Sequence, residues 1–129
     1  VRNCAPDDLS VRRACAQALS ALAHFHALKV VHSDVKPQNV FVDSASRAYL
    51  GDLDVSVDSV TRCSTRQITT RVGFTKGYDA PELLMTGATT MTDVFAFGQL
   101  LLTDDLVAES PARNALASAM AAVDPSQRP

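Results

Sequence analysis

The residues best suited to chemistry lie in one short polar segment, residues 32–40. Asp34, Lys36 and Asn39 place a carboxylate, an ammonium and a carboxamide within six residues of chain. A carboxylate can accept a proton, an ammonium can contact a phosphate, and an amide oxygen can bind a hard metal ion; phosphoryl transfer needs all three. Pro37 fixes one φ angle and removes a hydrogen-bond donor, so the segment is predicted to be a loop. The alternative is a polar turn between two strands, without chemistry.

A second acid follows a predicted β-hairpin. Residues 40–42 and 48–50 have the pattern of strands, and 43–47 have that of a turn. Asp52 lies just beyond the hairpin, thirteen residues after Asn39. Because the two ends of a tight hairpin are close together, Asn39 and Asp52 can reach one Mg²⁺ ion beside a nucleotide. By itself, Asp52 also fits an acidic turn after a strand.

A long amphipathic helix is predicted directly before the loop, from Leu9 to about Leu28. Its apolar stripe consists of Cys15, Leu19, Leu22 and His26. His24 and His26 could suggest a metal site, but no cysteine or carboxylate lies at ligand spacing from them. We interpret them as a pair at the boundary of the buried face.

Three further segments have a clear character. Residues 91–102 are apolar almost all round and predict a buried helix, with Thr92 as its cap and Asp93 as an acid that needs donors. Residues 104–113 fit a linker, and 114–123 fit one helix. Residues 55–71 have no period and predict a surface loop. Its hydroxyl groups could be phosphorylated, and none is singled out: Ser59, Thr61, Ser64, Thr65, Thr69 and Thr70.

Composition describes a globular chain with one core. With 129 residues, 47% of them hydrophobic, there is room for one domain. A net charge of −2 gives no reason to expect nucleic acid or an anionic membrane as a partner. No apolar run approaches the roughly 18 residues of a membrane span. Three scattered cysteines suggest reduced thiols and a cytoplasmic or nuclear location. Since the chain begins at Val1, we expect a fragment.

Taken in order, the motifs resemble those of protein kinases. Residues 32–39 resemble the catalytic loop H-R-D-x-K-P-x-N, and 52–54 resemble D-F-G. Residues 75–82 resemble T-x-x-Y-x-A-P-E, 93–98 resemble D-V-W/Y-S-x-G, and 124–129 resemble D-P-x-x-R-P. The resemblance covers nearly the whole chain. It implies the C-terminal lobe of a eukaryotic-type serine/threonine kinase domain over residues 1–129, a mainly α part of the α+β kinase fold, with helices around a small catalytic hairpin.

The resemblance also implies a chemistry, in which ATP and Mg²⁺ are the cofactors and a protein is the substrate. Asp34 orients the substrate hydroxyl and accepts its proton, and Lys36 steadies the γ-phosphate. Asn39 and Asp52 hold Mg²⁺, and Phe41 packs under the adenine.

Other positions acquire specificity and structural roles by the same resemblance. Thr75 bonds the catalytic acid and lysine, shapes the substrate groove and, with Lys36, points to serine/threonine specificity. His32 is assigned a structural role in the loop motif. Asp93 accepts hydrogen bonds from the loop backbone, and Glu82 forms a buried ion pair with Arg128.

The sequence departs from the family pattern in several places. Ser33 replaces the arginine that pairs with a loop phosphate, Leu53 replaces Phe as an apolar plug, and Asp54 replaces a conformationally free Gly. The Gly-rich loop, strand lysine and helix glutamate of the N-terminal lobe are missing from this chain, so that lobe is an expected partner. Only 31 residues separate Asp93 from Asp124, which is short for the family. The alternative function is a pseudokinase or lobe remnant that acts as a protein-binding module.

Overall fold

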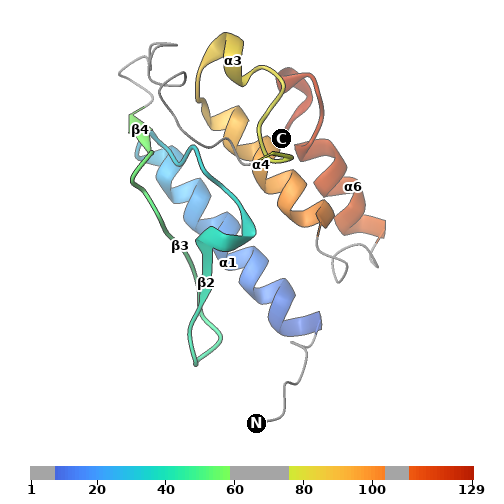
Figure 1. The fold of residues 1–129 in the computed structure, drawn as a ribbon. Helices are drawn as coiled ribbons and strands as arrows, with labels where there is room; N and C mark the ends of the chain where they lie inside the picture. Colours follow the sequence, from blue (N-terminus) through green and yellow to red (C-terminus); the bar gives the residue numbers. More distant parts are fainter. Residues whose placement is uncertain (1–7, 59–75, 104–110) are drawn as a thin grey trace.

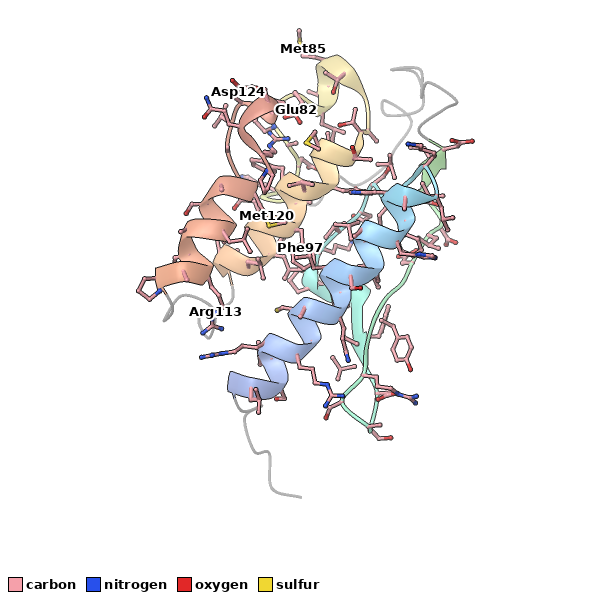
Figure 2. All side chains as sticks on the ribbon, turned by 180° about the vertical axis from the view of Figure 1, so that it is seen from behind. Glu82, Met85, Phe97, Arg113, Met120 and Asp124 are labelled. Carbon is pink, nitrogen blue, oxygen red and sulfur yellow. The ribbon has the colours of Figure 1, made fainter. Side chains whose placement is uncertain are left out.

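The computed structural model describes residues 8–58, 76–103 and 111–129. Within them the chain forms α-helices α1, α3, α4 and α6 and two small antiparallel sheets (Figure 1). The mainly helical prediction is confirmed. Helix α4 lies between α1 and α6, and the hairpin lies on the far side of α1 in both views (Figures 1 and 2).

Helix α1 spans Asp8–Ala27, within one residue of the predicted helix. Its most buried side chains are Ala18 and Leu22, which lie on or beside the predicted stripe. The helix ends where Lys29 adopts a left-handed conformation with φ of 64°. The Lys29 amide donates to the His26 carbonyl at 3.0 Å. This hydrogen bond closes the last turn of the helix, and the chain then enters the loop.

The predicted hairpin is confirmed as β2 (Val40–Val42) paired with β3 (Ala48–Leu50). Asp43 holds the turn, because its Oδ1 accepts hydrogen bonds from the amides of Ala45 and Arg47 at 2.9 Å each. The backbone hydrogen bond from Arg47 is the largest influence on the pKa of Asp43, which is lowered. The carboxylate form is therefore the one that shapes the turn.

A second sheet corrects the prediction of a featureless loop from residue 55. Val30–Val31 (β1) pairs with Val57–Asp58 (β4). Strands of two residues carry no detectable period, so the sequence could not indicate this pair. The remainder of the predicted loop, with its six hydroxyl-bearing residues, lies outside the described residues.

Helix α4 spans Thr90–Thr103 and is the centre of the core, as predicted. Phe97 is fully buried, and Figure 2 shows it with Met120 between the helices. The core cluster joins α1, α4, α6 and the hairpin through Ala18, Leu22, Val35, Leu50, Phe97, Leu100, Leu101, Ala117 and Met120.

The predicted cap of α4 was wrong by three residues. The amide of Thr92 donates to Oγ1 of Thr89 at 3.3 Å, and the amide of Thr89 donates to Oγ1 of Thr92 at 2.9 Å. Thr89 is thus the cap, and Thr92 completes a reciprocal box from inside the helix. Two threonines at this spacing both fit a cap, and only the geometry separates them.

Helix α6 spans Pro111–Met120, so it begins and ends three residues earlier than predicted. Proline is favoured at the first helical position, where its missing N–H is not needed. Helix α3 spans Leu83–Thr86, a single turn that ends at Gly87 with φ of 77°. Two 3₁₀ turns, η1 (Pro37–Asn39) and η2 (Pro125–Gln127), complete the elements.

Candidate active site

The structure brings together the three loop residues that the sequence singled out. The Lys36 ammonium lies 2.8 Å from Oδ2 of Asp34. Nδ2 of Asn39 donates to the backbone carbonyl of Asp34 at 2.7 Å and to its Oδ2 at 3.0 Å. Oδ2 of Asp34 is therefore held by both side chains.

The local sequence explains how the Asn39 side chain reaches Asp34. Pro37 begins the 3₁₀ turn η1, and the Asn39 amide donates to the Lys36 carbonyl at 3.0 Å. This tight turn points the buried Asn39 side chain back at the acid. Its nitrogen is occupied by Asp34, which leaves its oxygen as the atom that can bind a cation.

A backbone hydrogen bond ties the hairpin end to the loop. The amide of Gly51 donates to the Asn39 carbonyl at 3.0 Å, and Asp52 follows at once. Asp52 is exposed and has φ of 64°, the left-handed conformation that non-glycine residues rarely adopt. A Cβ at Gly51 would lie 3.0 Å from the Phe41 ring, so a larger residue here would require that exposed ring to shift slightly.

The donor set fits a magnesium ion bound together with a nucleotide. Asn39 and Asp52 offer oxygen atoms, which Mg²⁺ prefers, and Mg²⁺ often takes only one or two protein carboxylates with phosphates and waters. Among the described residues there is no cluster of three or more His, Cys, Asp or Glu side chains that could hold a metal alone. A metal here would depend on the phosphates of its ligand.

Asp93, in the first turn of α4, receives hydrogen bonds from the loop backbone. Its Oδ1 accepts from the Ser33 amide at 2.8 Å, and its Oδ2 accepts from the His32 amide at 2.7 Å. Asp93 is 1% exposed. A buried carboxylate needs such donors, and these two fix the beginning of the loop to the central helix.

His32 connects the loop to the hairpin. Its Nε2 donates to the Gly51 carbonyl at 2.9 Å, and its Nδ1 accepts from the Asp34 amide at 3.2 Å. These partners require the tautomer with the proton on Nε2, because a carbonyl can only accept and an amide can only donate. The fully buried ring thus links Asp34 to the segment that carries Asp52.

His26 is the residue that sequence reasoning missed. Its Nε2 donates to Oδ2 of Asp93 at 2.9 Å. Its place on the apolar stripe of α1 indicated that it faces the interior. No sequence signal identified an acid 67 residues away as its partner.

Glu82 and Arg128 form the expected ion pair, with Nη1–Oε1 at 2.5 Å and Nη2–Oε2 at 3.0 Å. The Arg128 side chain is fully buried, and its remaining donors reach the carbonyls of Ala122, Met91 and Val123. All five guanidinium N–H groups therefore have acceptors. Burial by itself raises the pKa of Glu82, but the hydrogen bonds and charge of Arg128 outweigh it and hold the pKa below 4.5.

Two expectations around Asp52 need correction. Leu53 is 43% exposed and does not plug the core of the described structure. Asp54 is absent from the described residues with positive φ, so the backbone conflict expected from its replacement of glycine does not arise. The left-handed residue is Asp52 instead. Thr75, the expected substrate-groove residue, lies outside the described residues.

One cavity in the described part of the chain lies away from these polar residues. It has a volume of about 850 Å³ and lies between α1, the hairpin and α4. Apolar side chains such as Val11, Val40 and Phe97 dominate its lining, and Asp34, Lys36, Asn39 and Asp52 do not contribute. Chemistry, and not volume, identifies the candidate site.

An acid held by a lysine and an asparagine, beside an exposed second acid, is the arrangement of a phosphoryl-transfer loop. The model of the protein kinase domain family matches residues 2–122. The chain belongs to the protein kinase domain family.

Relatives of this chain include plant receptor kinases and receptor-like cytoplasmic serine/threonine-protein kinases. It is 45% identical over 87 residues to L-type lectin-domain containing receptor kinase V.7 of Arabidopsis thaliana. The matched residues make up 64% of this chain and 13% of that protein. It is 40% identical over 88 residues to EPD1-interacting receptor-like cytoplasmic serine/threonine-protein kinase 5D of Gossypium barbadense, covering 66% of this chain and 19% of that protein. The chain thus spans a fifth or less of these relatives. No helix in the described ranges is both long and apolar enough to cross a membrane.

Proposed function

We propose that the protein carrying this chain is a serine/threonine protein kinase that transfers the γ-phosphoryl group of ATP to protein hydroxyls. The observation that carries the proposal is the Asp34 carboxylate held by Lys36 and Asn39, in a chain of the protein kinase family. The names of relatives that include serine/threonine-protein kinase support the specificity.

Each site residue has a role that follows from its position. Asp34 orients the attacking hydroxyl and accepts its proton, and Lys36, beside it, contacts the γ-phosphate. Asn39 and Asp52 contribute oxygen ligands to Mg²⁺. The bound Mg²⁺–ATP supplies the transferable phosphoryl group, and the protein contributes position and electrostatics.

Further proposals concern the parts around the site. Phe41, 53% exposed next to Gly51, is available to pack under the adenine. Thr75 is proposed to line the substrate groove. Residues 1–129 are proposed to form the C-terminal lobe, completed by an N-terminal lobe. An intracellular location is supported by the relative whose name includes receptor-like cytoplasmic kinase.

A second candidate is a pseudokinase that acts as a protein-binding module. The observation that favours it is Asp54, an acid at the position where the family motif has a glycine. Ser33 in place of an arginine also fits this candidate. The Asp34, Lys36 and Asn39 arrangement favours the active kinase.

The test is Asp34→Asn in the complete protein. The isosteric amide keeps the shape but cannot accept the proton, so we expect phosphotransfer to fall by about 10²–10⁴-fold while circular dichroism stays unchanged. Asp58→Asn in β4 is the matched control, because it makes the same chemical change at an exposed residue. Wild-type activity in Asp34→Asn would contradict the proposed role.

A further inference from the structure

We propose that Asp79 selects substrates in which a lysine or an arginine stands directly beside the hydroxyl residue that is phosphorylated. The inference rests on the proposed kinase function, because it takes Asp34 as the group that meets the substrate hydroxyl. To that function it adds a chemical class of substrate, which is a basic peptide segment. Asp79 is a specificity residue in this proposal and takes no part in the chemistry.

A small cleft connects Asp34 with Asp79. The charged side chains among its described lining residues are three acids: Asp34 of the loop, Asp79 of the segment 76–82 before α3, and Asp93 of α4. Asp34 is held by Lys36, and Asp93 accepts hydrogen bonds from the loop amides. Asp79 comes from a different segment, so it can meet a part of the substrate that lies beyond the loop.

The cleft is too small to take an apolar side chain. Its volume is about 20 Å³, which is room for about one water molecule. The cleft therefore cannot select a substrate residue by burying a hydrophobic group. Recognition must take place at its rim, where charge and hydrogen bonding decide.

The backbone on both sides of Asp79 is fixed. The Tyr78 hydroxyl forms a hydrogen bond with Oγ1 of Thr103, at the end of α4, at 3.3 Å. Ala80 is buried, and its carbonyl accepts from the Leu83 amide at 3.0 Å. Asp79 itself is half-buried. A half-buried carboxylate on a fixed segment meets a partner with little further loss of conformational entropy.

A hydroxyl that reaches Asp34 brings its neighbour in the substrate to Asp79. In the transfer, the hydroxyl oxygen bonds to the γ-phosphorus, the bond from that phosphorus to ADP breaks, and Asp34 accepts the proton. The hydroxyl oxygen therefore lies about 3 Å from the Asp34 carboxylate. Successive residues of an extended peptide advance by about 3.5 Å. Because the cleft between the two acids is so small, the residue directly beside the hydroxyl residue is the one that meets Asp79.

The sign of the charge sets the preference. A carboxylate attracts an ammonium or a guanidinium group and repels another carboxylate, and a charge-assisted hydrogen bond is roughly twice as strong as a neutral one. Ser33, which also lines the cleft, is neutral where the family pattern has an arginine. A serine does not repel a basic substrate residue as an arginine would. Asp79 therefore favours lysine or arginine and disfavours aspartate or glutamate.

The experiment measures kcat/KM of the complete protein with peptides that contain one serine and differ only in the residue beside it. Arginine, alanine and glutamate are compared, each placed directly before or directly after the serine. At one of these positions we expect arginine to exceed alanine by about five- to tenfold, the effect of one partly exposed charge-assisted hydrogen bond, and glutamate to fall below alanine. Equal values for the three residues at both positions would overturn the proposal. This series uses the wild-type protein and does not depend on a folded variant.

Three variants separate Asp79 from the general charge of the protein. Asp79→Asn should abolish the preference for arginine, and Asp79→Glu, which keeps the charge, should retain it. Asp58→Asn removes one negative charge from β4 and should leave the preference unchanged. A preference that survives in Asp79→Asn, or that is lost equally in Asp58→Asn, would overturn the proposal.

Failure of the kinase function would have a different signature. If the complete protein phosphorylates none of the peptides, the proposed function fails, and the affinity of the same peptides, measured by fluorescence anisotropy, decides the role of Asp79. Tighter binding of the arginine peptide by the wild type than by Asp79→Asn would support that role. Equal binding by the two proteins would overturn it.

Discussion

Asn39 has two separable functions in the loop, one for each atom of its carboxamide. Its nitrogen donates to Asp34 at 2.7 and 3.0 Å, and its oxygen is proposed to bind Mg²⁺. An aspartate at this position would retain an oxygen ligand but would lose the donor and face Asp34 with a like charge. The nitrogen therefore explains why an asparagine, and not an acid, suits this metal position.

We predict that Asn39→Asp lowers the free energy of unfolding of the chain by about 1–3 kcal/mol at neutral pH, because a buried donor is replaced by a second acceptor. Urea denaturation measures the change. Gln38→Glu is the control, since it adds the same charge at an exposed neighbouring residue. Equal stability of the two variants would contradict the role of the Asn39 nitrogen.

At the scale of residues, sequence predicted identities better than contacts. Asp34, Lys36 and Asn39 were found because their order and the proline between them are specific. The partner of His26 was not found, because its acid is distant in the sequence and reaches it only through the packing of α1 against α4. The backbone torsions that favour glycine were expected at Asp54, but the residue with a left-handed φ is Asp52, two positions earlier.

The crossing of α4 and α6 depends on one glycine. A Cβ at Gly98 would lie 2.7 Å from the Ala121 amide nitrogen and 2.8 Å from the Met120 Cβ. The first of these neighbours is backbone, which cannot move aside without shifting the end of α6. The close approach thus requires Gly98, although glycine is a poor helix former.

We predict that Gly98→Ala destabilises the chain by about 1–3 kcal/mol, because overpacking outweighs the gain in helix propensity. Thermal denaturation followed by circular dichroism measures this. Ser118→Ala, at an exposed position of α6, should change stability little. A higher melting temperature for Gly98→Ala would show that the helices can separate and that the close approach is not required.

Among the elements, those with a long period or a tight turn were predictable. Helices α1 and α4 and the β2–β3 hairpin follow from apolar periodicity and turn residues within one segment. The β1–β4 pair was not predictable, because each strand has two residues and its partner is distant in the sequence. The cap at Thr89 and the start of α6 at Pro111 were each missed by three residues. Within such a distance several residues fit the beginning of a helix equally well, so the sequence does not separate them.

At the scale of the molecule, the Glu82–Arg128 pair joins the segment before α3 to the end of the chain. Arg128 also lies 5.0 Å from the centre of the Phe95 ring in α4. Three separate segments therefore meet at one guanidinium. Breaking the pair leaves a buried positive charge without its counter-ion.

We predict that Glu82→Gln lowers stability by about 3 kcal/mol at pH 7. Because the pKa of Glu82 is lowered on folding, its contribution is complete above its ordinary value of 4.5 and is lost as the pH falls through the folded pKa. The difference between wild type and Glu82→Gln should therefore shrink on acidification. Urea titrations from pH 7 to about pH 3 measure it, with Asp54→Asn, the same chemical change at an exposed residue, as a control. A difference that stays constant would contradict the ion-pair explanation.

The proposed nucleotide site also sets an expectation for the 129-residue chain by itself. The residues proposed to bind the nucleotide are Lys36, Asn39 and Asp52 for the phosphates and the half-exposed Phe41 for the adenine. All four belong to one loop and the hairpin that follows it, so they would contact the nucleotide from one side. A ligand held from one side keeps much of its surface in water and gains little affinity. We predict that calorimetric titration with Mg²⁺–ATP gives a Kd of about 1 mM or weaker, further weakened by Asp52→Asn, with Asp58→Asn unchanged. Micromolar binding by the chain would mean that these residues suffice for the nucleotide, and that an N-terminal lobe contributes mainly to catalysis.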